Sequence, residues 1–318
     1  MQIVVIKKNQ MKKLLFLIPA LLLLGCGNDP EVEPNEVGPL KIEIEGKAYH
    51  FFPEAVEAGV DENNISVFVH YATKKTDPAF PVGYGVGWSF SNGHFTEAVM
   101  SYIEDGENYG TYDFNPAETF SIKNYRFDPD TRKLSFDYEG KLHGKSHELK
   151  TNLGSITIKG SIDLDNIPQK SLQSDKSYAT FHAGNFSFYG CKRIMGSTSE
   201  ATSHHLFSND GYRLMFIFDR PFPQYGATLP LTYEFDAQST GNRISFFQFT
   251  GTPYSSDVKI VIKPEDWKEY PCSGSFTIEE ITEDRIKGTF SMDIQDGDKV
   301  IHKTEDGEFL FRSKSTSM

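Results

Sequence analysis

The sequence predicts an all-β protein with two tandem antiparallel β-sandwich or small-barrel domains, which follow an apolar leader and an acidic tether. Three observations predict this class. Apolar residues recur at every second position over most of the chain, which is the period of a half-buried strand. Asn-Gly and Asp-Gly pairs fall between these runs and tolerate the positive φ of two-residue hairpin turns. Rings are abundant, with 26 Phe and 15 Tyr in 318 residues, as expected of cores built between sheets.

The chain opens with a targeting leader and not with a membrane-spanning helix. Lys12 and Lys13 precede an apolar run at 14–24, whose 11 residues fall well short of the roughly 20 that a spanning helix needs. The run closes on Leu23-Leu24-Gly25-Cys26, which resembles the bacterial lipobox. The resemblance implies a signal peptide over 1–25 and acyl chains on Cys26, which becomes the first residue of the mature protein. An ordinary signal peptide with an incidental cysteine is the alternative.

Residues 26–39 are expected to form a solvated tether. The segment after the cysteine reads GNDPEVEPNEVGP, whose acids and prolines leave little to bury. Acids soon after the cysteine resemble the surface-export signals of Bacteroidota lipoproteins. These resemblances imply an outer-membrane, lipid-anchored protein, on the periplasmic face or the cell surface, whose membrane partner is reached through Cys26.

The charge of the mature chain excludes some partners. The leader carries four lysines and no acid, so its removal takes the formal net charge from −12 to −16. A chain this acidic argues against nucleic-acid binding and against docking of a basic face on anionic lipid.

Two β domains are predicted, at 40–165 and 178–313, with a polar linker at 166–177. Alternation is clear at 40–44 and at 156–164, and Tyr212–Phe218 is apolar enough to be a central strand. Short sequence echoes recur in the same order in both halves, which indicates a duplication. The pattern at 286–309 resembles the C-terminal hairpin of small Bacteroidota lipoprotein domains of unknown function. That family has no assigned chemistry to transfer.

Turn-forming residue pairs mark the expected ends of strands. Hairpin turns are predicted at Asn92-Gly93, Glu139-Gly140, Asp210-Gly211, Asp296-Gly297 and Asp306-Gly307. One helical turn is predicted at 264–268, because a proline stands at its first position.

Cys191 and Cys272 remain once Cys26 is assigned to lipid. Outside the cytoplasm such a pair most simply forms a disulfide. Two buried free thiols, or a reactive Cys191, are the alternatives.

Aromatic residues give the sequence's candidate ligand surface. Tyr84 and Trp88 lie in a Gly-rich stretch, and Trp267 follows a predicted strand with Tyr254 nearby. Exposed Trp and Tyr rings stack on sugars and anchor protein interfaces, although in most β-sandwiches such rings fill the core.

Catalytic and metal signatures are missing from the sequence. It has no G-x-S-x-G motif and no metal-ligand spacing around His204-His205, so we expect no enzyme activity, cofactor or metal. The leading hypothesis is a non-catalytic module that binds glycan or protein. A structural or assembly subunit of the envelope is the alternative, and an enzyme without a recognisable motif is the third.

Overall fold

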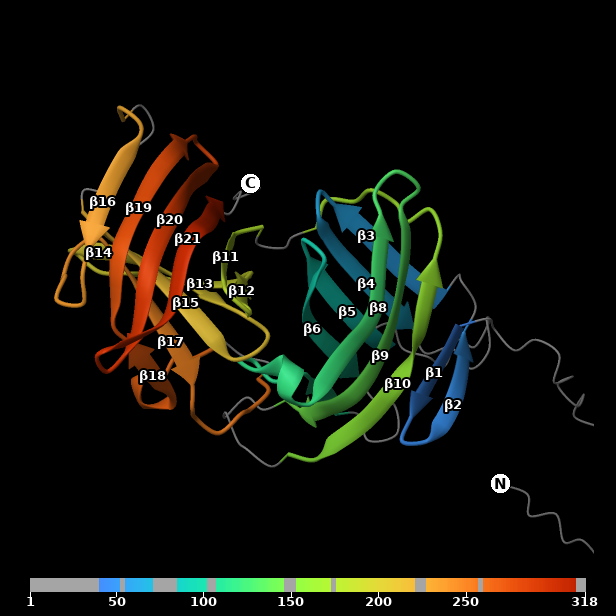
Figure 1. Ribbon diagram of the computed structural model, residues 1–318. Helices are drawn as coiled ribbons and strands as arrows, with labels where there is room; N and C mark the ends of the chain where they lie inside the picture. The colour runs from blue at the N-terminus through green and yellow to red at the C-terminus, as the bar shows by residue number, and fades with distance from the viewer. Residues whose placement is uncertain are drawn as a thin grey trace, which may run out of the picture. The chain divides into compact units, whose positions relative to one another are not determined.

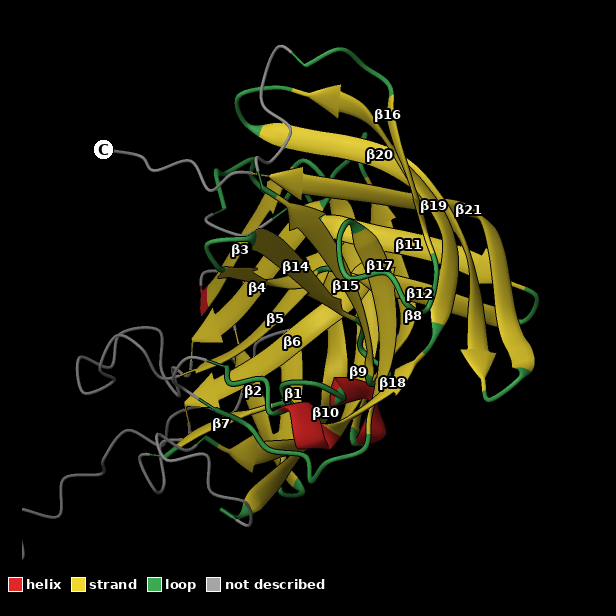
Figure 2. Cartoon of the chain, turned by 90° about the vertical axis from the view of Figure 1, so that its left-hand side faces the viewer, coloured by secondary structure: helices red, strands yellow, loops and turns green. Residues whose placement is uncertain are grey.

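The computed structural model describes residues 40–51, 55–70, 85–101, 107–145, 153–172, 176–220, 227–256 and 260–312. The predicted signal peptide, Cys26, the predicted tether and Tyr84 lie outside these residues. The described residues all belong to one compact unit, Pro39–Met318. Strands make up nearly all of the regular structure (Figures 1 and 2), and the helical turns include η2 (Pro116–Glu118) and η3 (Pro264–Asp266). The predicted all-β class is therefore confirmed.

The N-terminal sheet contains ten antiparallel strands in the order β2-β1-β10-β9-β7-β6-β5-β4-β3, with β8 paired to β9. All of them come from residues 40–164. They are β1 (Leu40–Ile44), β2 (Lys47–Phe51), β3 (Val56–Asp61), β4 (Asn64–His70), β5 (Gly85–Ser91), β6 (His94–Ser101), β7 (Asn108–Gly110), β8 (Phe120–Asp128), β9 (Lys133–Gly144) and β10 (Ser155–Leu164).

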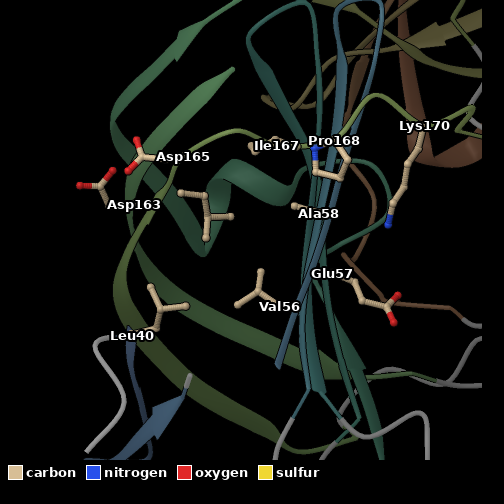
Figure 3. A pocket seen from close by; sticks show the side chains of 10 residues that line it. Leu40, Val56, Glu57, Ala58, Asp163, Asp165, Ile167, Pro168 and Lys170 are labelled. Atoms are coloured by element: carbon tan, nitrogen blue, oxygen red, sulfur yellow. The ribbon is translucent and has the colours of Figure 1, made fainter. Parts of the chain in front are cut away.

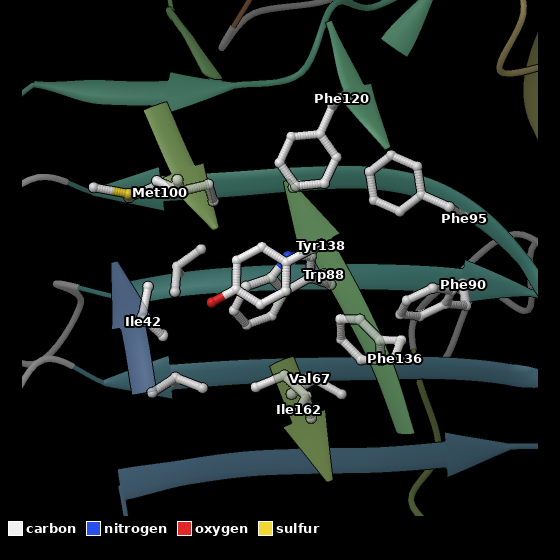
Figure 4. Packing of buried hydrophobic residues seen from close by; sticks show 14 of the residues in the cluster. Ile42, Val67, Trp88, Phe90, Phe95, Met100, Phe120, Phe136, Tyr138 and Ile162 are labelled. Atoms are coloured by element: carbon white, nitrogen blue, oxygen red, sulfur yellow. The ribbon is translucent and has the colours of Figure 1, made fainter. Parts of the chain in front are cut away.

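This sheet curls around a single core. Trp88 on β5 packs against Phe136 and Tyr138 on β9, with ring centroids 5.8 and 4.6 Å apart, although β6 and β7 separate these strands in the sheet. Figure 4 shows β9 and β10 running across the direction of β4, β5 and β6 on the other side of these rings. The predicted alternation explains the inner face, since Ile42 and Ile44 are fully buried while Lys41 is exposed.

Residues 178–312 form a sandwich of two sheets. The six-stranded sheet has the order β12-β11-β21-β20-β19-β16 and the five-stranded sheet the order β13-β14-β15-β17-β18. Their strands are β11 (Tyr178–Ala183), β12 (Phe186–Gly190), β13 (Lys192–Ser197), β14 (Ala201–Phe207), β15 (Tyr212–Asp219), β16 (Leu231–Phe235), β17 (Arg243–Phe249), β18 (Trp267–Tyr270), β19 (Cys272–Ile281), β20 (Arg285–Asp296) and β21 (Lys299–Arg312).

Rings from both sheets meet in the sandwich core. Phe216 on β15 lies 5.6 Å from Phe290 and 4.9 Å from Phe309, which belong to the opposite sheet. The strand β15 is central, as its apolar sequence predicts, because it pairs with β14 and β17. The chain therefore forms one curled sheet before the predicted linker and two packed sheets after it. Pro39–Met318 nevertheless clusters as one unit. The division into two domains stays a prediction.

Three of the five predicted hairpin turns are confirmed, and two are wrong. Asn92-Gly93 has φ values of 47° and 82° between β5 and β6, and Gly211 and Gly297 also have positive φ. Gly140 and Gly307 instead lie inside β9 and β21. A Cβ on Gly140 would lie 2.3 Å from the carbonyl oxygen of Thr119, and one on Gly307 would lie 2.5 Å from the Phe290 ring. These glycines therefore permit close packing and do not turn the chain. The predicted helical turn at 264–268 is present as η3 over Pro264–Asp266.

The predicted linker covers the free edge of β3. Val60 donates its N–H to the carbonyl of Pro168 and accepts from the N–H of Lys170, and it forms a parallel bridge with Gln169. Further along, the Asp61 carboxylate accepts from the N–H of Leu172 at 2.9 Å. The segment thereby satisfies the backbone N–H and C=O of Val60, which the edge of the sheet would leave open.

Candidate functional site

The strongest candidate site is a pocket of about 700 Å³ at the seam of the N-terminal sheet. The sheet ends at β3 on one side, and β3 does not pair with β1 or β10, so the curled sheet stays open there. Figure 3 shows the side chains that line the opening. They come from the start of β1, from β3, from the end of β10 and from the segment after it: Leu40, Val56, Glu57, Ala58, Asp163, Leu164, Asp165, Ile167, Pro168 and Lys170.

The floor of this seam pocket is apolar. Leu40 and Ile167 are buried, and Val56, Ala58 and Leu164 pack against the core cluster of the sheet. A pocket of this volume lined mainly by apolar side chains is typical of sites for small molecules, and β-barrel mouths are a common place for them.

The rim of the seam pocket is mostly acidic. Asp163 and Asp165 are about two-thirds exposed and lie 3.4 and 3.2 Å from Lys133 Nζ, whose pKa they raise chiefly through hydrogen bonds. Glu57 lies 3.4 Å from His70 Nε2. Lys170 is the one cation among the lining residues. The rim therefore suits a polar group that is cationic or uncharged.

Glycine at position 59 lets the side chains of Lys170 and Leu172 lie close to β3 at the pocket wall. A Cβ there would lie 3.2 Å from Cδ of Lys170 and 3.3 Å from Cδ2 of Leu172. These contacts are tighter than ordinary packing, so the segment could not lie as closely on β3 with a larger residue.

The predicted aromatic ligand surface is wrong for each of its described members. Trp88 is 1% exposed and Trp267 7%, and Tyr254 is also buried. Trp88 fills the core of the N-terminal sheet, while Trp267 and Tyr254 pack around Phe114. A buried ring cannot stack on a sugar, so the glycan hypothesis loses the residues on which it was based.

The predicted disulfide is absent from the structure, because Cys191 and Cys272 are both free and buried. Cys272 donates its thiol to the carbonyl of Tyr270 at 3.3 Å and is part of the sandwich core. Burial raises the pKa of each thiol to about 12, so neither is a ready nucleophile. The prediction failed because an even number of cysteines says nothing about whether the fold brings them together.

The adjacent histidines point to opposite faces of β14. His204 is buried against Phe311, with ring centroids 4.3 Å apart, whereas the His205 ring lies 3.1 Å from the Ser203 hydroxyl. Burial lowers the pKa of His205 to about 4. Within the described ranges, no group of three or more His, Cys, Asp or Glu side chains could hold a metal ion.

Sequence reasoning missed the seam pocket entirely. Its acids, Glu57, Asp163 and Asp165, are ordinary solvent-facing residues in the alternating pattern. The sequence shows only a polar break after Leu164, which predicts a linker and not a pocket wall. The pocket depends on how the ends of the sheet meet, which is a long-range property.

Comparisons with protein-family models, with curated proteins and with solved structures found no match for this chain. Among the described residues, no helix is long and apolar enough to cross a membrane.

Proposed function

We propose that this chain is a lipid-anchored, non-catalytic binding protein of the cell envelope, and that its ligand is a small amphipathic molecule held in the seam pocket. The observation that carries the proposal is the opening of about 700 Å³ with an apolar floor and an acidic rim. The ligand has an apolar body that rests on Leu40, Val56 and Leu164 and a cationic head that meets Asp163 and Asp165.

Binding is tested with probes of equal chain length and different heads. Dodecylammonium, dodecanoate and dodecyl maltoside compete against a fluorescent apolar dye in the purified protein. The acidic rim predicts that dodecylammonium binds at least tenfold more tightly than dodecanoate. Equal affinities, or tighter binding of dodecanoate, would contradict the proposed head group.

Variants locate the site. Ala58→Phe places a ring in the pocket and should abolish dye binding, because Ala58 lines the opening. Val300→Phe makes a similar change at a 42% exposed position in the six-stranded sheet and should leave binding unchanged. If both variants bind as the parent does, the ligand site lies elsewhere.

The anchor is tested at Cys26. Cells that express the full chain should incorporate labelled palmitate into it and hold it in the membrane fraction, and Cys26→Ser should abolish both. Each buried CH₂ contributes about 0.8 kcal/mol to membrane affinity, so loss of the acyl chains should release the protein fully. A variant that stays in the membrane fraction would exclude Cys26 as the anchor.

A further inference from the structure

A second cavity surrounds the buried carboxylate of Asp113. This residue follows β7, in a segment that contacts residues of the sandwich before the chain returns to the N-terminal sheet at β8. The N–H of Asp113 donates to the carbonyl of Tyr254 at 3.0 Å, and the next residue, Phe114, packs against Trp267. Asp113 is thus held in place by backbone and core contacts on both sides.

Only one of the two carboxylate oxygens of Asp113 is satisfied. Lys192 Nζ donates to Oδ1 at 3.3 Å and to the backbone carbonyl of Asp113 at 3.2 Å. Asp113 Oδ2 is buried and has no hydrogen-bond partner in the described part of the chain, and the residue is 9% exposed. An unsatisfied buried carboxylate oxygen carries a large desolvation cost, so Asp113 is an unusual residue to find beside a cavity.

The space beside Asp113 has a volume of about 200 Å³. Four charged side chains line it, two acids and two bases, together with Tyr112 and Ser256: Glu97, Asp113, Lys145 and Lys192. Burial raises the pKa of Asp113, and the nearby Lys192 and Lys145 charges oppose that shift, which places both ammonium groups in the field of this carboxylate. The lining is formally neutral and carries both signs.

Gly110 lines the cavity wall, and the Lys145 side chain packs against it. A Cβ at Gly110 would lie 2.6 Å from Cε of Lys145. The Lys145 side chain therefore passes directly over the glycine, at the end of β7 nearest Asp113.

We propose that this cavity binds a compact zwitterion of the size of a free α-amino acid, whose ammonium meets the Asp113 carboxylate and whose carboxylate meets Lys145. The volume is below the range of about 300–1,000 Å³ that is usual for drug-sized ligands, so a molecule of a few heavy atoms fits it. Both signs of charge in the lining select a ligand that carries both.

The test compares zwitterions with single charges on the full chain in detergent. Glycine and L-alanine are titrated by calorimetry beside methylammonium and acetate, which carry one charge each. Both zwitterions should bind at least tenfold more tightly than either ion. If methylammonium binds as tightly as glycine, the carboxylate contact is wrong. If none of the four binds, the cavity holds water only and the proposal fails.

Two variants assign the contacts. Asp113→Asn and Lys145→Gln should each weaken glycine binding at least tenfold, and Asp163→Asn in the seam pocket should not change it. Near-ultraviolet circular dichroism establishes that each variant is folded. If Asp113→Asn does not fold, glycine binding to Lys145→Gln alone decides the outcome. Unchanged glycine affinity in a folded Lys145→Gln protein would overturn the proposed site.

Discussion

Removal of the Phe114 ring should destabilise the protein more than any change at an exposed apolar position. Phe114 is 3% exposed, and its ring centroid lies 5.1 Å from both Phe207 and Trp267, 5.4 Å from Phe249 and 5.8 Å from Tyr254. Truncation of such a ring to alanine costs about 3–5 kcal/mol through lost burial and the cavity left behind. With a urea m value of about 3 kcal/mol/M, the midpoint of unfolding should fall by roughly 1–1.7 M.

The assay uses the fact that the chain has two tryptophans, in two different cores. In a Trp88→Phe background, fluorescence reports only on Trp267, which contacts Phe114 directly. Urea unfolding of Phe114→Ala in that background is compared with the background alone. Val300→Ala, at a 42% exposed position, is the matched control and should change stability by less than about 0.5 kcal/mol.

A loss below about 1 kcal/mol for Phe114→Ala would refute this reasoning. It would mean that the four neighbouring rings repack without Phe114 and that the segment after β7 is not anchored by it. Because Asp113 adjoins Phe114, that outcome would also remove the rigidity on which the second cavity depends.

Three further predictions concern protonation and thiol chemistry. Burial raises the pKa of Asp113 above its ordinary value of 3.8. The contribution of Asp113 to stability is therefore greatest below pH 3.8 and is lost as the pH rises through the folded-state pKa. In urea titrations, the free energy of unfolding relative to Asp113→Asn should decline from about pH 3 to about pH 7. For Asp61, burial also raises the pKa, but the hydrogen bonds from Lys176 and from the Leu172 N–H outweigh it and lower the pKa. The free energy of unfolding should therefore exceed that of Asp61→Asn above pH 3.8, and the difference should vanish on acidification. A difference that grows on acidification would contradict the assignment. Cys191 and Cys272 should resist iodoacetamide in the folded protein and react in concentrated guanidinium, as counted by mass spectrometry, whereas rapid labelling of either native thiol would show that it is accessible.

Local pattern was enough to predict the strands but not the way in which they assemble. The alternation at 40–44 and the positive-φ turn at Asn92-Gly93 are properties of a few neighbouring residues, and both are confirmed. Gly140 has the same local signature as a turn glycine. Its role is set by Thr119 on an adjacent segment, which no local pattern reports.

The candidate sites lay beyond sequence reasoning for the same reason. For Trp88 and Trp267 the sequence offers only the general tendency of β-sandwich rings to fill the core, and the contacts with Phe136 and Phe114 decide for the core. Asp113 stands in a short polar and aromatic stretch with no motif around it. Its buried carboxylate pairs with Lys192, which lies 79 residues away.

The two halves share a strand order, apart from β16, which pairs with β19 in the second half and has no counterpart in the first. In the first half β2-β1-β10-β9-β8 are neighbours, and in the second β12-β11-β21-β20-β19. The meander β3-β4-β5-β6 likewise has its counterpart in β13-β14-β15-β17. The sequence echoes that follow this order, such as 120–122 with 276–278, are therefore matched by topology.

Closure into one sheet or separation into two depends on the strand that comes directly after the meander. In the first half the three residues of β7 pair with both β6 and β9, and this bridge joins the meander to the rest of the sheet. In the second half the equivalent partner of β17 is β18, which ends at Tyr270. Pro271 comes next, which has no N–H to donate to a ladder, and β19 then begins in the opposite sheet at Cys272. A short bridging strand therefore produces the curled sheet whose open seam forms the larger pocket, and a proline corner produces the sandwich that buries Cys272.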